Sequence, residues 1–215
     1  MEPYINNKFI IIPIQIAFNE SNKKKDLEFP KKWSSIKTID ESKETFVRYR
    51  GFKSMGMLTG KVNNLTVIDV DDVSAWNKLE INYPSDCVKV ETNNGFHLYF
   101  AYEPTLHTIS NIIDGIDIRN DGGNSILPPS SYKTGEEIFE YTFENDSIET
   151  AISKMKNLPK IPESLLKLFN ESVNKPLTIH IELPINEKVR KIRKSLDKVS
   201  PRFYKNYGNI KREKS

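Results

Sequence analysis

The sequence predicts a mixed domain of short β-strands and a few helices, followed by a basic tail. Several short apolar runs have the length and β-branched composition of strands, and Leu65–Asp72 is the clearest of them. Asn94-Gly95 separates two such runs, and Asn-Gly between strand patterns is the strongest short-range signal for a β-hairpin. Glu163–Phe169 has the pattern of an amphipathic helix. A chain of 215 residues fits one domain, or one domain with two lobes and a tail.

The first sixty residues predict a strand, a helix and a second strand. Phe9–Ile14 is an extended apolar segment, Ser42–Arg50 has the composition of a short helix, and Gly51–Gly60 resembles a strand bounded by turns. The basic run at 23–25 predicts a loop, which either is solvated or faces a phosphate. Trp33 is expected to anchor the core of an N-terminal lobe or to form a lid.

Leu65–Asp72 contains the carboxylates that suggest chemistry. Side chains alternate along a strand, so Val67, Asp69 and Asp71 share one face. Two neighbouring carboxylates repel each other and resist burial, and a divalent cation between them relieves both effects. Mg²⁺ and Mn²⁺ prefer such oxygen ligands. The alternative is a strand that runs into an acidic, solvated turn.

A predicted hairpin and a third carboxylate-bearing strand follow. The hairpin pairs Cys87–Thr92 with His97–Tyr102. Within it, His97 is expected at the mouth, on the less apolar face, where a histidine is commonly a surface or hydrogen-bonding residue. Gly115–Ile118 is the third strand, and its Asp117 stands between two isoleucines.

The sequence also predicts a turn, two helices, two strands and a loop in the rest of the domain. Residues 121–123 predict a turn, because Asp and Gly favour the backbone angles of turns. The expected helices are Val73–Glu80 and Ile148–Met155, the expected strands are Asn124–Leu127 and Ile138–Phe143, and Ser130–Gly135 is expected to be a loop.

Composition limits the class of protein. Hydrophobic residues make up 37% of the chain and charged residues 28%, which allows a globular domain with a real core. Cys87 is the only cysteine, so an intrachain disulfide and a cysteine-based zinc site are excluded and a reducing, intracellular compartment is expected. Phe9–Ile16 is too short to span a membrane. Net charge is only +3, so a nucleic-acid footprint requires clustered charge. The expected boundaries are 1–170 for the folded domain and 171–215 for a linker and basic tail.

The motifs, in this order, resemble those of the archaeo-eukaryotic primase superfamily. The closer resemblance is to the N-terminal domain of the bifunctional DNA primase/polymerases (prim-pol) of plasmids, phages and large DNA viruses. It covers roughly residues 8–168. The matching residues are Thr59-Gly60; Val67-Ile68-Asp69-Val70-Asp71; Thr92, Gly95 and His97-Leu98-Tyr99-Phe100; Asp117-Ile118-Arg119; Gly122-Gly123; and Pro128-Pro129-Ser130.

The resemblance implies a fold and a site. The implied fold is α+β, with an N-terminal αβ lobe packed on a sheet like that of the RNA-recognition motif and the active site in the cleft between them. Asp69, Asp71 and Asp117 would bind two Mg²⁺ or Mn²⁺ ions. The implied nucleotide-binding residues are His97, Gly95, Arg119, Gly122, Gly123 and Ser130.

Three of those assignments have alternatives at the level of sequence. Arg119 neutralises phosphate, contacts template or forms an exposed salt bridge. Gly122 and Gly123 let the backbone approach the nucleotide or form a plain turn. The superfamily often has a serine two residues before the histidine, whereas this chain has Gly95, so a hydroxyl contact to the triphosphate is lost. If Asp117 is not the third ligand, Asp114 or Asp121 is the next choice.

The implied function is template-directed nucleotide polymerisation that starts chains de novo. Its partners would be single-stranded DNA, nucleoside triphosphates and a replicative helicase, fused downstream or separate, with no membrane. One rival is a metal-dependent nuclease or phosphohydrolase, because acidic triads serve those enzymes as well. Another is a non-catalytic replication-origin binding module, against which the intact Asp69, Asp71, His97 and Asp117 argue.

Overall fold

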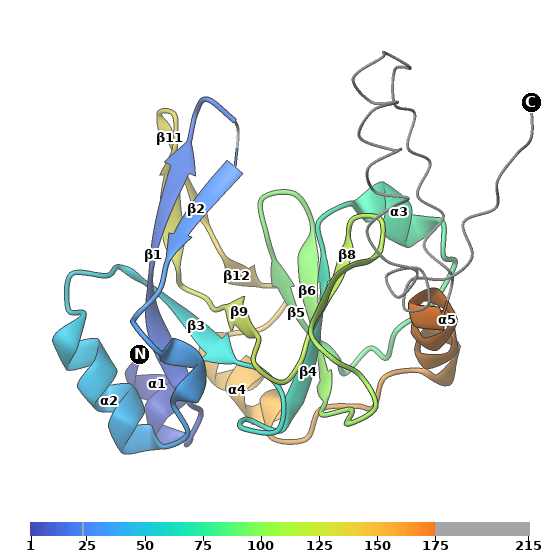
Figure 1. Ribbon diagram of the computed structural model, residues 1–215, viewed down its shortest axis with the longest axis horizontal. Helices are drawn as coiled ribbons and strands as arrows, with labels where there is room; N and C mark the ends of the chain where they lie inside the picture. Colours follow the sequence, from blue (N-terminus) through green and yellow to red (C-terminus); the bar gives the residue numbers. More distant parts are fainter. Residues whose placement is uncertain (23, 175–215) are drawn as a thin grey trace, which may run out of the picture. The chain divides into compact units, whose positions relative to one another are not determined.

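Two antiparallel β-sheets, each built from strands far apart in the sequence, form the framework (Figure 1). The computed structural model describes residues 1–22 and 24–174, and 1–173 form one compact unit. The predicted basic tail therefore falls almost wholly outside the described residues. The first sheet has the order β2-β1-β3-β9. Its strands are β1 (Ile11–Asn19), β2 (Lys24–Glu28), β3 (Ser54–Leu58) and β9 (Asn124–Ile126).

The second sheet contains the carboxylates, and its order is β12-β5-β6-β4-β8-β7. β4 lies inside this sheet between β6 and β8, and, as predicted, the Asn-Gly hairpin supplies β5 and β6. The strands are β4 (Leu65–Val70), β5 (Val88–Glu91), β6 (Phe96–Ala101), β7 (Ile109–Ile113), β8 (Ile116–Arg119) and β12 (Thr142–Phe143). The strand β7 was not expected from the sequence.

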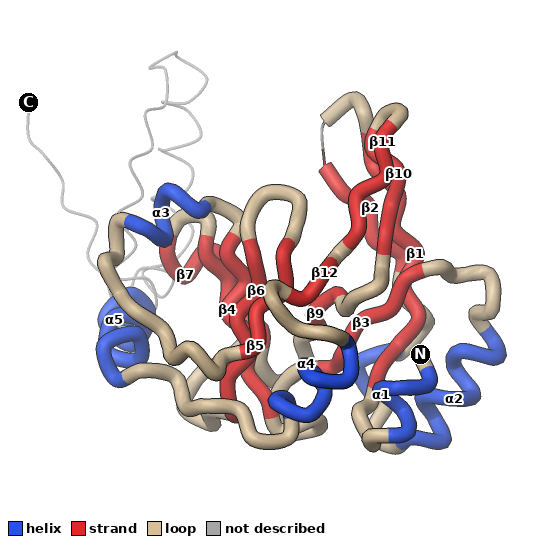
Figure 2. The backbone as a smooth tube through the Cα atoms, turned by 180° about the vertical axis from the view of Figure 1, so that it is seen from behind, coloured by secondary structure: helices blue, strands red, loops and turns tan. Residues whose placement is uncertain are grey.

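Alternate residues of the second sheet enter two different cores. Val67 and Tyr99 pack with the isoleucines of β1, whereas Ile68 and Phe100 pack with α5 (Glu163–Asn174) on the far side. Figure 2 shows α5 beside this second sheet, away from the first. Both faces of β4 and β6 are therefore covered. This explains why these strands are nearly continuous apolar runs that only the site residues interrupt.

Two predicted loops are strands. The basic run belongs in part to β2, which pairs with β1, and the expected loop at 130–135 contains β10 (Ser131–Thr134). β10 pairs with β11 (Glu137–Glu140) to form a two-stranded sheet beside β1. Figure 1 shows the β1–β2 and β10–β11 hairpins side by side. The predictions were wrong because most residues of β2 are exposed and carry no apolar alternation.

The last predicted strand is divided between two sheets. Residues up to Glu140 pair with β10, whereas Thr142 and Phe143 pair with β5. Tyr141 marks the change of partner, and its N–H donates to the Ser130 carbonyl oxygen. The alternation of Phe139, Tyr141 and Phe143 correctly indicated extended backbone. It did not indicate which strands pair with these residues, because strand pairing depends on segments far away in the sequence.

The helices agree with expectation in place and differ at their ends. α2 (Ile39–Arg48) begins earlier than predicted, because Thr38 and Glu41 form a capping box. α3 (Val73–Asn77) is shorter than expected, and α5 continues to Asn174, across the expected boundary after residue 170. The other helices are α1 (Glu2–Asn6), α4 (Ile148–Met155) and the 3-10 helix η1 (Trp33–Ser35).

Candidate active site

Three predicted site residues lie side by side in one row across β6, β4 and β8. The strand register pairs Asp69 with His97 on one side and with Asp117 on the other. Directly opposed residues of neighbouring strands have Cβ atoms about 4.5–5.5 Å apart and point to the same face. The row occupies the face of the second sheet that packs on the first. The register thus brings together three motifs that are separate in the sequence.

Asp71 completes an acidic cluster with Asp69 and Asp117. One carboxylate oxygen from each of the three lies within 4.8 Å of the others. β4 ends at Val70, not at Asp72 as predicted, because the N–H groups of Asp71 and Asp72 both donate to the Gly115 carbonyl oxygen. Asp72 then caps α3, its Oδ1 accepting from the backbone N–H groups of Ser74 and Ala75. Asp72 is therefore a capping residue outside the cluster.

Arg119 shares the face of Asp117, as predicted, and forms ion pairs with two of the carboxylates. Its Nη2 lies 3.3 Å from Oδ2 of Asp69 and also donates to Oδ2 of Asp117. The side chains of Asp69 and Asp117 are only 16% and 13% exposed, so the ion pairs are largely shielded from water. The salt-bridge alternative for Arg119 is thus present, but inside the site and not on the surface.

His97 lies next to the hairpin loop, as expected, but it is a buried hydrogen-bonding residue and not a surface residue. It is 5% exposed, with Nε2 3.3 Å from Oδ1 of Asp69 and Nδ1 3.0 Å from Oγ of Ser125. Ser125 belongs to β9, and its hydroxyl also bonds the Tyr99 hydroxyl at 2.8 Å. Only the surface alternative was wrong, because the sequence does not reveal that the first sheet covers this face. Contacts at both ring nitrogens hold the imidazole in one orientation.

The three carboxylates differ electrostatically. Burial alone would raise the pKa of Asp69, but His97 and Arg119 outweigh it and lower this pKa to about 2. The pKa of Asp71 is raised, first by partial burial and then by the neighbouring Asp69 charge. Asp69 is therefore ionised at neutral pH without any metal. An added cation would stabilise the ionised form of Asp71, which burial and the Asp69 charge disfavour. Such perturbed groups are common at functional sites.

The part of the chain that contains the acidic cluster matches a known protein family. A family model described as the N-terminal domain of bifunctional DNA primase/polymerases matches residues 2–163. The chain belongs to this family. Membership suggests DNA primase/polymerase activity and hence a nucleotidyltransferase, and the match gives no support for the expected helicase partner. No curated protein matches the chain in sequence. Within residues 1–22 and 24–174, no helix is long and apolar enough to cross a membrane.

Lys25 is a residue of this prim-pol domain that the sequence prediction did not place in the site. It reaches across from β2, and its Nζ donates to the Tyr141 hydroxyl at 3.0 Å. The Tyr141 ring lies 6.2 Å from the His97 ring, and the Lys25 charge opposes the upward shift of the Asp71 pKa. The only feature of the sequence that pointed to Lys25 was the basic run at 23–25, for which a loop facing a phosphate was one of two interpretations.

Gly95, where the superfamily often has serine, lies too close to β4 for any side chain. A Cβ atom here would come within 1.9 Å of the Val70 carbonyl oxygen. Its N–H donates to Oγ1 of Thr92 at 3.1 Å, and the Thr92 N–H donates back to the Gly95 oxygen. The short turn of this prim-pol domain thus explains the departure. It also shows that the Gly95 amide is already engaged.

The other expected nucleotide-binding residues lie elsewhere. Gly122 and Gly123 line a cavity that contains none of the three clustered carboxylates. Ser130 is 1% exposed, and its hydroxyl donates to the Met55 oxygen and accepts from the Met55 N–H. That role is structural, so Ser130 is left out of the site proposed below.

Proposed function

We propose that the domain is a metal-dependent nucleotidyltransferase that begins and extends primers on single-stranded DNA. The observation that carries the proposal is the row of His97, Asp69 and Asp117, completed by Asp71, within a prim-pol domain. Its fold would be the α+β arrangement of the primase superfamily, in which an RNA-recognition-motif-like sheet forms one wall of the active-site cleft. The protein would be intracellular and would act at a site of DNA replication.

The three clustered carboxylates would hold a pair of divalent ions. Three carboxylates with oxygens within 4.8 Å supply hard, anionic ligands of the kind that Mg²⁺ and Mn²⁺ prefer. Asp69, Asp71 and Asp117 would hold the ions, which when bound help to activate the primer 3′-hydroxyl and to neutralise the leaving pyrophosphate.

The remaining residues of the site would bind and orient the nucleotide. His97, fixed by Ser125 at Nδ1, would exchange its Nε2 contact with Asp69 for a hydrogen bond to the triphosphate. Arg119 would exchange its carboxylate partners for phosphate oxygens, which guanidinium groups bind well. Lys25 would approach the phosphates from the β1–β2 hairpin, opposite Asp71, and neutralise their charge.

A primer-synthesis assay tests the proposal directly. The full chain is incubated with single-stranded DNA, labelled ribo- or deoxynucleotides, and Mg²⁺ or Mn²⁺. We expect labelled products that depend on template, nucleotide and metal, and that disappear in Asp117→Asn. Loss of template without any need for nucleotides would indicate the nuclease alternative. Template binding without synthesis under all conditions would indicate the origin-binding module, and either result would overturn the proposal.

A further inference from the structure

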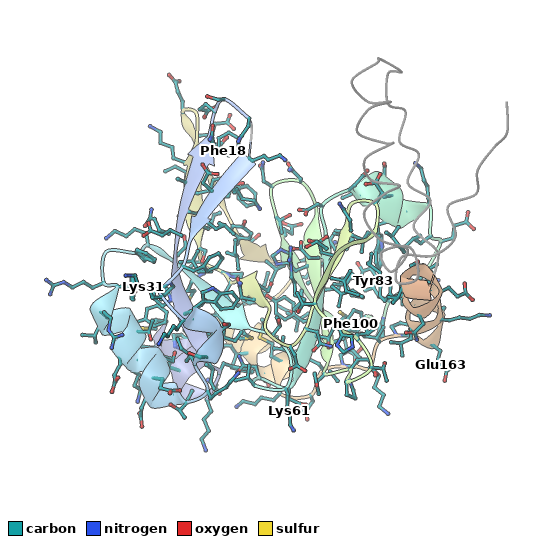
Figure 3. All side chains as sticks on the ribbon, in the orientation of Figure 1. Phe18, Lys31, Lys61, Tyr83, Phe100 and Glu163 are labelled. Carbon is teal, nitrogen blue, oxygen red and sulfur yellow. The ribbon has the colours of Figure 1, made fainter. Side chains whose placement is uncertain are left out.

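A second feature with nucleic-acid chemistry lies outside the acidic cluster. It is a cavity of about 450 Å³ between η1, the start of α2 and the two turns that follow β3 and β8. Ligand pockets typically span about 300–1,000 Å³, so one nucleotide unit fits. Figure 3 labels Lys61, which lies on the turn between β3 and β4 and lines this cavity.

The walls combine an aromatic ring, two cations and bare backbone. Trp33 lines the cavity and stacks on Phe29, with ring centroids 5.2 Å apart. Lys37 and Lys61 are both exposed, and Lys37 Nζ donates to the Ser34 carbonyl oxygen at 3.3 Å. Gly122 has a φ of +75°, and no atom lies within 4 Å of the position a Cβ would take. Glycine here leaves the backbone open to close approach by a ligand.

The charge of the cavity suits a phosphodiester better than a triphosphate. Asp121 is the only acidic residue among those that line it, and two lysines face that single carboxylate. Asp121 accepts from the Lys61 N–H at 2.8 Å and from the Tyr102 hydroxyl at 2.7 Å, so it is held in place. The remaining excess of about one positive charge matches one backbone phosphate of a nucleic-acid strand.

The cavity is within reach of the acidic cluster. Asp117 and Asp121 are four positions apart in the sequence, so their Cα atoms are at most about 13 Å apart in extended backbone. Arg119 lies between them and faces the cluster. A strand of only a few nucleotides would connect the two places, since the rise per nucleotide in duplex DNA is about 3.4 Å.

We propose that this cavity binds one nucleotide unit of the single-stranded template, a few nucleotides away from the reacting position. The base stacks on Trp33, and the phosphate lies between Lys37 and Lys61 against Gly122. Aromatic stacking and lysine contacts are the usual means of binding single strands without reading their sequence. The inference rests on the proposed function for the identity of the strand. It assigns Gly122 and Gly123 to the template and not to the incoming nucleotide.

Strand binding without catalysis tests the assignment. Fluorescence anisotropy of a labelled single-stranded oligodeoxynucleotide is measured on the full chain, with chelator and without nucleotides, over a range of salt concentrations. Lys37→Gln combined with Lys61→Gln is expected to lower the salt slope of binding by about 0.7, the value for one single-strand phosphate. Trp33→Leu is expected to weaken binding by about five-fold or more. Lys156→Gln, at the exposed C-cap of α4, is the matched control and should change neither quantity.

The outcomes separate this inference from the function it rests on. Unchanged affinity and salt slope in the double lysine variant would overturn the cavity assignment, even if primers are made. Full competition by a nucleoside triphosphate at equal concentration would also overturn it, because the cavity would then hold the incoming nucleotide. Because Trp33 packs on Phe29, Trp33→Leu can also destabilise the fold. Its binding result is used only if its melting temperature is near that of wild type. If it is not, the double lysine variant alone tests the assignment. Absence of primer synthesis with normal strand binding would refute the proposed function alone.

Discussion

Asp69→Asn should destabilise the metal-free protein, although it removes one of three crowded negative charges. In the folded state, burial opposes ionisation of Asp69, but His97 and Arg119 bring its pKa from the ordinary 3.8 down to about 2. At 1.36 kcal/mol per pKa unit, the ionised Asp69 contributes roughly 2 kcal/mol to the free energy of unfolding at pH 7. The expected loss in Asp69→Asn is therefore about 2 kcal/mol. Urea denaturation in the presence of EDTA measures it.

The pH dependence gives the sign of the effect. A carboxyl group with a depressed pKa in the folded state stabilises the protein above its unfolded pKa, and this contribution is lost as the pH falls through the folded pKa. The difference between wild type and Asp69→Asn should therefore be full above about pH 5, fall to about half by pH 3, and vanish below about pH 2. Groups far from the site titrate alike in the two proteins and cancel in the comparison, whereas Asp71 does not, because the Asp69 charge contributes to its raised pKa.

Asp71→Asn is the matched comparison, with the opposite expectation. The pKa of Asp71 is raised by partial burial and by Asp69, so its ionised form costs stability at pH 7. Neutralising it should leave the metal-free protein as stable or slightly more stable, while both variants lose primer synthesis. Equal stability of Asp69→Asn and wild type at pH 7, or retained synthesis in either variant, would refute the reasoning.

Three further predictions concern other parts of the molecule. Lys25→Gln should raise the KM for nucleotides several-fold without changing affinity for single-stranded DNA, whereas Lys24→Gln, an exposed neighbour on β2, should change neither. His97→Ala should lower both the melting temperature and nucleotide use, because it removes the buried contacts that the imidazole makes with Asp69 and Ser125, at a cost of about 1–3 kcal/mol; an unchanged melting temperature would contradict this. A chain ending at Asn174 should still fold and should bind single-stranded DNA with a smaller salt slope, since the removed segment is rich in lysine and arginine; an unchanged slope would show that the tail does not contact the strand.

The local part of the fold was within reach of the sequence. Alternation of side chains placed Asp69 on one face of β4 and Asp117 between two buried isoleucines. Asn94-Gly95 predicted the place of the hairpin of β5 and β6, although the loop has four residues, 92–95, and neither Asn94 nor Gly95 has a positive φ. Residue type at each position also indicated which carboxylates resist burial and therefore need a partner. All of these are properties of a few neighbouring residues.

Only the tertiary structure decided which motifs meet and what surrounds them. The register that puts His97, Asp69 and Asp117 in one row depends on pairing between strands separated by long connections. Burial of His97 depends on the first sheet, and Lys25 enters the site from an edge strand whose exposed residues carry no periodic signal. Strand pairing and sheet packing are set by the summed burial of the whole chain, which no single window of sequence contains.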